Sequence, residues 1–163
     1  YYLPEGKWTY FFTGEEFEGG RWYTDKYGYC EIPLFVRENS IVAIGAQEDN
    51  CEYDYEDGAE LRVYALLEGK MARTVVYDRK NNKAIEASVL KEGNQLNIRV
   101  KTEEEYRVRL VNVQANEAEG AIEMRSDGKD TWIWLDGDAN VIVTIDNPTD
   151  KTNGIPTQIR YTP

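Results

Sequence analysis

The sequence predicts an all-β fold made of two small antiparallel β-sandwich domains with very little helix. The chain has twelve tyrosines and four tryptophans but only two methionines, a composition that suits the pleated surface of a sheet. Short apolar runs separated by turn residues recur along the chain, which is typical of a sandwich. No segment shows a convincing 3.6-residue period: the nearest candidate, Ala115 to Glu123, is interrupted by Gly120.

The first 45 residues predict four or five short strands. Pro4-Glu5-Gly6 is a turn in which proline presets its own φ and glycine supplies a positive one. Trp8 to Phe12 follows, with residues that favour a strand. The pair Gly19-Gly20 marks a later reversal. The apolar segment from Ile32 to Ile44 is broken by an expected tight turn at Arg37-Glu38-Asn39.

The next segment completes the first predicted domain. Glu48 to Gly58 is the most acidic stretch of the chain, and it ends in Asp57-Gly58, a hairpin-type turn signal. From Leu61 to Glu68 apolar and polar residues alternate with a period of two. Gly69-Lys70 then falls between two apolar strands. We therefore expect a proximal sandwich over residues 1–69 and a distal one over residues 70–163.

The distal half repeats the pattern of short strands and turns. Alternation of apolar and polar residues, as in Leu96-Asn97-Ile98-Arg99-Val100, indicates half-buried antiparallel strands. The expected strands are Met71–Asp78, Ala84–Leu90, Leu96–Lys101, Tyr106–Leu110, Ala121–Arg125, Thr131–Leu135, Asn140–Asp146 and Thr157–Tyr161.

The formal net charge of −11 disfavours nucleic acid and anionic membrane surfaces as partners, because both are polyanions. No apolar run approaches the roughly 20 residues that span a bilayer. The two cysteines, Cys30 and Cys51, are fewer than a disulfide-stapled secreted domain would carry. A bridge between them stays open. The sequence does not fix the compartment, and the low cysteine count favours the cytoplasm.

Histidine is absent, which removes the base of Ser-His-Asp and Cys-His systems and the commonest zinc ligand. The sequence contains no glycine-rich nucleotide motif, so we expect no cofactor and no metal. Asp136-x-Asp138-x-Asn140 imitates the start of a calcium loop, but Val141 stands where that loop needs glycine. Residues 127–140 are therefore better explained by hairpin turns. Because thirty acidic residues make chance carboxylate pairs inevitable, we assign no catalytic residue.

Two tryptophans are candidates for stacking on a sugar ring. Trp132 and Trp134 are two residues apart, so on a strand they point to the same face, opposite Ile133 and Leu135. Burial of both rings is the competing interpretation, since tryptophan is highly buried on average.

Several motifs of the first 68 residues resemble a known family. They are Leu3-Pro4-x-Gly6-x-Trp8, Thr13-Gly14-Glu15, Gly19-Gly20, Ile32-Pro33-Leu34-Phe35-Val36-Arg37, Asp54-Tyr55-x-Asp57-Gly58 and Leu61-Arg62-Val63-Tyr64. Together they resemble the β-sandwich that follows the catalytic (β/α)8 barrel of glycoside hydrolase family 31, which includes α-glucosidases and α-xylosidases. Beyond about residue 70 the resemblance is only positional, to a second sandwich that family members usually carry.

The resemblance implies that the chain is the C-terminal piece of a longer polypeptide and lacks the barrel with the catalytic aspartates. The parent enzyme would hydrolyse terminal α-linked glucose or xylose with retention. The chain itself would be inactive; it would support the barrel and supply a candidate oligomer contact. The residues expected to dock on the barrel are Trp8, Phe12, Trp22, Leu34, Phe35 and Arg37.

Two other functions are alternatives to this supporting, or scaffold, role. The first is an autonomous carbohydrate-binding module that takes an α-linked oligosaccharide, with Trp132 and Trp134 as its platform. The second, a self-sufficient enzyme, requires that the chain alone turn over aryl α-glycosides.

Overall fold

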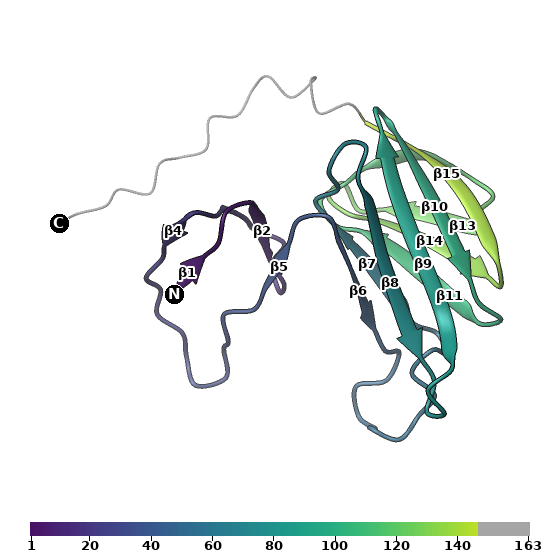
Figure 1. Cartoon of the computed structure of the whole chain (residues 1–163), viewed down its shortest axis with the longest axis horizontal. Coiled ribbons are helices and arrows are strands. Elements are labelled where there is room, and N and C mark those ends of the chain that lie inside the picture. The colour runs from purple at the N-terminus through teal and green to yellow at the C-terminus, as the bar shows by residue number, and fades with distance from the viewer. Residues whose placement is uncertain (147–163) are drawn as a thin grey trace.

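The computed structural model describes residues 1–146, which contain fifteen β-strands and no helix (Figure 1). The predicted all-β class is confirmed. Residues 1–146 therefore contain no helix that is long and apolar enough to cross a membrane.

Residues 1–38, here called the aromatic module, form two small antiparallel sheets beside a larger sandwich (Figure 1). One sheet has the order β3-β2-β5, and the other pairs β1 with β4. Their bounds are β1 Tyr2–Leu3, β2 Lys7–Tyr10, β3 Glu16–Glu18, β4 Arg21–Trp22 and β5 Phe35–Arg37. The module has little interior of its own, because only Leu3, Thr9 and Val36 are buried.

One glycine is essential to the folding of this module. The amide of Gly19 donates to the carbonyl oxygen of Gly6 at 2.7 Å. A Cβ atom at Gly19 would lie 1.8 Å from the carbonyl oxygen of Pro4, so no other residue allows the two backbone segments to approach this closely. The Gly19-Gly20 signal in the sequence thus marks a close backbone approach as well as a reversal.

Residues 40–145 form a sandwich of two five-stranded sheets with the orders β12-β15-β10-β9-β8 and β13-β14-β11-β7-β6. All pairs are antiparallel except β7 with β11. The bounds are β6 Ser40–Ile44, β7 Glu60–Tyr64, β8 Met71–Tyr77, β9 Lys83–Glu92, β10 Gln95–Lys101, β11 Glu105–Leu110, β12 Ala115–Glu119, β13 Glu123–Ser126, β14 Thr131–Asp136 and β15 Ala139–Ile145.

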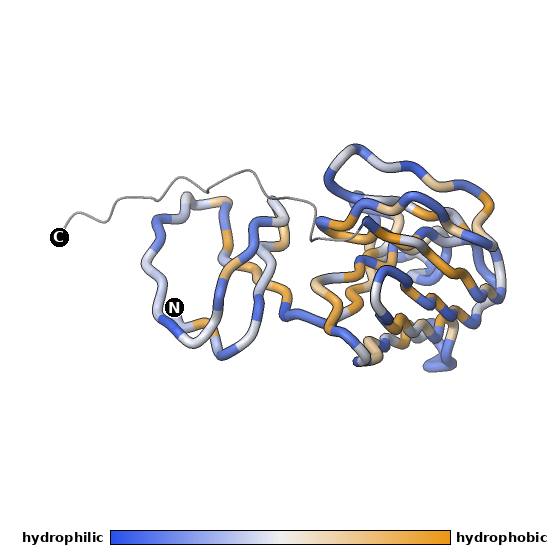
Figure 2. The backbone as a smooth tube through the Cα atoms, turned by 90° about the horizontal axis from the view of Figure 1, so that it is seen from above, coloured by the Kyte–Doolittle hydropathy of each residue, from blue (hydrophilic) through white to orange (hydrophobic). Residues whose placement is uncertain are grey.

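The core lies between the two sheets. It follows from the alternation of hydrophobic and hydrophilic residues along the strands, which Figure 2 shows as orange and blue. Along β10, Leu96, Ile98 and Val100 are buried. Along β14, Ile133 and Leu135 are buried. Because successive side chains of a strand point to opposite faces, this burial turns the intervening residues of β14, including both tryptophans, to the outer face.

The expected strands of the distal half occur with bounds shifted by at most two residues. Thr157–Tyr161 lies outside the described residues. The segment from Ala115, which came nearest to a helical pattern, forms the strand β12, and it pairs with β15 through a β-bulge.

The expected division at Gly69-Lys70 does not coincide with the sheets. β6 and β7 precede it, yet both belong to the sheet that contains β11 and β14. The chain leaves the aromatic module instead at the predicted break after Arg37, where Asn39 adopts a φ of 57°. The amide of Asn39 donates to the carbonyl oxygen of Ala65 at 2.9 Å, which fixes this reversal against the end of β7.

Candidate functional site

The aromatic module presents large apolar side chains to solvent. Trp22 is 76% exposed and Phe12 is 60% exposed, and Leu34 is also exposed. Arg37 ends β5 with its side chain exposed. Three further exposed apolar residues were not among the expected docking residues: Tyr2, Tyr29 and Ile32. The rings of Tyr2 and Trp22 lie next to each other, with centroids 5.5 Å apart. Exposed apolar side chains that form a contiguous patch typically mark an interaction site.

The other two residues expected at this surface are partly buried within the module. The indole N–H of Trp8 donates to the carbonyl oxygen of Pro4 at 2.8 Å. The ring of Phe35 contacts those of Tyr1, Tyr10 and Phe17, with centroids 5.2–5.4 Å apart. Phe35 therefore holds the rings of the module together, and Trp8 braces its first turn.

Polar contacts from the sandwich hold the Thr13-Gly14 turn of the module. Asn112 donates from its side-chain amide to the carbonyl oxygen of Gly14 at 2.7 Å. The ammonium of Lys129 donates to the carbonyl oxygen of Thr13 at 2.6 Å. Beside this turn, the ring of Phe11 lies under the guanidinium of Arg62, 5.1 Å from ring centroid to Cζ.

The outer face of the sheet β13-β14-β11-β7-β6 carries arginines between tryptophans, and we call it the arginine face. Its residues stand in two rows across the strands. One row is Arg125, Trp132, Arg109, Arg62 and Val42, and the other is Glu123, Trp134, Arg107, Glu60 and Ile44. Four arginines on one face stand out in a chain whose net charge is −11.

Glu60 is the buried anion at the centre of the arginine face. Its side chain is 5% exposed, and it pairs with Arg62 and with Arg107, the latter at 2.6 Å. Burial alone would raise the pKa of Glu60, but the hydrogen bonds and positive charges of these two arginines hold that pKa below its usual range. The carboxylate is therefore ionised at neutral pH, and each of its oxygens has an arginine partner.

The two tryptophans differ in how their arginines are held. Arg109 lies 5.1 Å from the ring centroid of Trp132 and is 28% exposed. Its guanidinium binds the buried carboxylate of Asp130 at 2.6 Å. Arg125 lies 5.3 Å from the ring centroid of Trp134 but is 68% exposed, and its partner is the exposed Glu123. The stack on Trp132 is fixed, whereas exposed ion pairs such as the one that holds Arg125 are weak.

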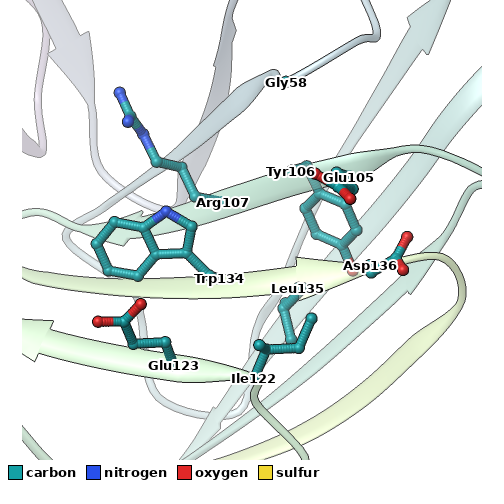
Figure 3. A pocket seen from close by; sticks show the side chains of 9 residues that line it. All are labelled: Gly58, Glu105, Tyr106, Arg107, Ile122, Glu123, Trp134, Leu135 and Asp136. Carbon is teal, nitrogen blue, oxygen red and sulfur yellow. The ribbon is translucent and has the colours of Figure 1, made fainter.

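A cleft of about 350 Å³ opens beside Trp134 (Figure 3). The side chain of Trp134 lies between those of Arg107 and Glu123, whereas Glu105, Asp136 and Ile122 lie at the other end. The remaining lining residues are Gly58, Tyr106 and Leu135. Tyr106 is buried, and its hydroxyl has no hydrogen-bond partner among the described residues. This burial and the charges of Asp138 and Asp136 raise the pKa of Tyr106.

The acidic turns have structural roles. Asp138 accepts a hydrogen bond from the amide of Thr102 at 2.9 Å, and Gly137, with a φ of 62°, completes the hairpin between β14 and β15. Over residues 1–146, no group of three or more Asp, Glu, Cys or His side chains is arranged to hold a metal. Cys30 and Cys51 are exposed and not bridged to each other.

Sequence reasoning identified the tryptophans of this face but missed its arginines. The alternation of Arg107 and Arg109 with buried Tyr106 and Val108 was visible, and it places both arginines on an outer face. What the sequence did not reveal was the register of β11 against β14, which sets Arg109 opposite Trp132 and Arg107 opposite Trp134.

Two family descriptions match the chain in succession. Residues 1–42 match "Glycosyl hydrolase family 31 C-terminal domain", and residues 54–145 match "Alpha-xylosidase YicI, C-terminal domain". The second match covers more than half of the chain.

Known enzymes match part of the chain. The α-xylosidase XylQ of Lactiplantibacillus pentosus is 29% identical over 47% of this chain and 10% of its own length. An α-xylosidase of Saccharolobus solfataricus is 38% identical, and α-glucosidase 2 of Bacillus thermoamyloliquefaciens is 30% identical, over the same shares. The chain matches about a tenth of the length of these relatives.

Solved structures share the fold over most of the chain. The cycloalternan-forming enzyme of Listeria monocytogenes, in complex with a pentasaccharide substrate, superposes with a TM-score of 0.75 and 16% identity over 90% of this chain and 17% of that enzyme. A Flavobacterium johnsoniae family 31 dextranase complexed with isomaltotriose gives 0.68 and 14% over 90% of this chain and 24% of its own.

Proposed function

Because this chain belongs to the C-terminal domains of family 31 glycoside hydrolases, we propose that it is a non-catalytic accessory region of an α-glycosidase. Its role is to support the catalytic barrel of the parent enzyme, with the aromatic module as the docking surface. The observation that carries this proposal is the exposure of apolar side chains on residues 1–38, chiefly Trp22 and Phe12. Burying them against a barrel removes apolar surface from water, at about 25 cal/mol per Å².

The construction of the aromatic module supports a docking role. A small layered domain normally hides one face of each sheet against another layer. Here Val36 is buried against Tyr64 and Val111 of the sandwich, but the rings around Phe35 are only partly covered. A second layer supplied by the barrel would complete this module.

The proposed parent hydrolyses terminal α-linked glucose or xylose. The matching relatives named α-xylosidase and α-glucosidase support this substrate class, and the small share of their length that the chain matches leaves the reaction to the rest of the parent. The carboxylates whose contacts are described above serve turns and ion pairs, so we assign them no catalytic role. A contact between copies of the parent is a further role for the sandwich, where Met71, Val75 and Tyr77 of β8 are exposed.

The docking role is tested in the complete gene product. We expect Phe12→Ser and Trp22→Ser to lower both its melting temperature and its turnover of aryl α-xylosides or α-glucosides. Tyr55→Ser is the matched control, because it removes an exposed aromatic ring that lies outside both the aromatic module and β8. Equal melting temperatures for the docking variants and wild type would overturn the docking role. Turnover by the 163-residue chain alone would overturn the non-catalytic assignment.

An autonomous carbohydrate-binding module is the second candidate, and one observation favours it. A cleft opens beside Trp134, and Arg125, the arginine over that ring, is exposed. Calorimetry of the 163-residue chain against α-glucan and xyloglucan oligosaccharides separates the candidates. Saturable heat supports a binding module, whereas no heat leaves the scaffold role alone.

A further inference from the structure

We propose that the cleft beside Trp134 is a carbohydrate subsite that takes one sugar ring of an α-linked oligosaccharide. The choice of an α-linked ligand rests on the proposed function of the parent enzyme. The choice of a neutral sugar rests on the chemistry of the cleft itself.

The lining of the cleft disfavours two other classes of small ligand. Glu105, Glu123 and Asp136 repel anions, and these charges together with that of Arg107 disfavour a wholly apolar ligand. A pyranose has an apolar C–H face that suits an indole ring, and its hydroxyls both donate to carboxylates and accept from a guanidinium. The cleft volume of about 350 Å³ lies within the usual range for small-molecule sites, about 300–1,000 Å³.

The guanidinium of Arg107 remains available for a ligand. Its Nε is the atom paired with Glu60, and its side chain is 47% exposed. Since a guanidinium has five N–H donors, Arg107 can hold Glu60 and also donate to a sugar hydroxyl beside Trp134. Glu123, on the opposite side of the indole in Figure 3, can accept from another.

The structure selects Trp134 over Trp132 as the stacking ring. Releasing Arg109 from Trp132 would break its pair with Asp130, whose carboxylate is buried, and a stranded buried charge is costly. Releasing Arg125 from Trp134 would break only the exposed pair with Glu123, which contributes little. A sugar ring can therefore replace the guanidinium on Trp134 but not the one on Trp132.

Two carboxylates at the end of the cleft lack a structural explanation. Glu105 and Asp136 are directly opposite each other on β11 and β14, an arrangement that destabilises a sheet because like charges repel. A ligand whose hydroxyls donate to both carboxylates would offset this repulsion. The exposed Ile122, at the same end of the cleft, supplies an apolar edge for the ring.

The test titrates the isotopically labelled 163-residue chain with maltotriose, isomaltotriose and a xylosyl-α-1,6-glucose disaccharide. Calorimetry measures affinity, and amide and indole N–H resonances locate the site. We expect a dissociation constant of about 1 mM for at least one probe, with shifts at the Trp134 indole and the Glu123 amide. Trp134→Ala should weaken binding about tenfold or more.

Three further variants serve as controls for this result. Glu123→Gln retains the shape of the cleft and should weaken binding even if Trp134→Ala fails to fold. Arg125→Ala uncovers the indole and should bind as tightly as wild type or more tightly. Trp132→Phe should leave the affinity unchanged.

The proposal is overturned if no probe binds saturably, if the shifts centre on Trp132 or on residues 1–38, or if Trp134→Ala and Glu123→Gln both bind like wild type. Phe12→Ser and Trp22→Ser, which test docking to the barrel, should not change the sugar affinity. A failure of docking and a failure of sugar binding are thus distinguishable.

Discussion

The side-chain amide of Asn112 donates a hydrogen bond to the backbone carbonyl oxygen of Gly14, 2.7 Å away and 98 residues distant in sequence. The same asparagine donates its backbone amide to Asp130 at 2.8 Å, and Asp130 binds Arg109, which lies over Trp132. A continuous chain of polar contacts thus joins the aromatic module to the arginine face. We infer that this series of polar contacts fixes the orientation of the aromatic module relative to the sandwich.

We predict that Asn112→Gly loosens the aromatic module while the sandwich stays folded. Glycine retains the positive φ of Asn112, 58°, so only the side-chain hydrogen bond is lost, at a cost of about 1 kcal/mol. Hydrogen exchange should quicken at Gly14 and Glu15 and stay slow in β10. Asn81→Gly is the matched control, because Asn81 also has a positive φ, 65°, in an exposed hairpin turn. Unchanged exchange at Gly14 would show that the hydrogen bond from Asn112 does not hold the module.

Glu60→Gln should destabilise the chain by about 3 kcal/mol, the lower end of the range for breaking a buried ion pair, because the arginines reach solvent. Glutamine has nearly the same shape but removes the charge that neutralises Arg62 and Arg107. Urea unfolding at pH 7 measures the difference. Glu86→Gln removes the exposed pair with Lys83 and should cost less than about 0.5 kcal/mol. Equal effects of the two variants would show that the burial of Glu60 has no energetic consequence.

The low pKa of Glu60 predicts an acid-sensitive stability. A carboxyl group whose pKa is lower in the folded chain than in the unfolded chain adds stability at pH values above its unfolded value, about 4.5. This stability is lost as the pH falls through the folded pKa, because the unfolded chain then binds the proton first. The urea midpoint of the wild type should therefore drop more steeply below pH 4.5 than that of Glu60→Gln. Parallel pH profiles would contradict this assignment.

The strands of this fold were predictable from local pattern, because alternation of apolar and polar residues fixes both the strand and its buried face. Leu96, Ile98 and Val100 illustrate this, since all three are buried as their spacing predicts. Which strands pair with each other was not predictable in the same way. β7 was expected to close a separate sandwich, but it pairs in parallel with β11, a contact between residues far apart in sequence that no local signal specifies.

The candidate sites show the same limit. The common face of Trp132 and Trp134 follows from a spacing of two residues, and the structure confirms that orientation. The difference between them depends on Arg109 and Arg125, which come from different strands, and on the burial of Asp130. Such differences arise only when the sheets are assembled, so the sequence pattern alone could not distinguish Trp132 from Trp134.

The sheet order predicts where the chain can be cut. A chain of residues 39–163 retains β6 and β7 together with Asn39, which anchors the start of β6 to Ala65. A chain of residues 70–163 loses both strands and with them the buried side chains of Leu61 and Val63. Deleting even one such side chain costs about 2–5 kcal/mol, a large part of the 5–15 kcal/mol that stabilises a typical domain.

We therefore expect residues 39–163 to unfold cooperatively in urea, monitored by near-ultraviolet circular dichroism, and residues 70–163 to lack a cooperative transition. The longer piece should still be less stable than the full chain, because Val36 no longer covers Tyr64 and Val111. A cooperative transition in residues 70–163 would restore the division at residue 69 that the sequence suggested. It would also mean that β11 keeps its place without the parallel partner β7, and the sheet order would then be a poor guide to the folding unit.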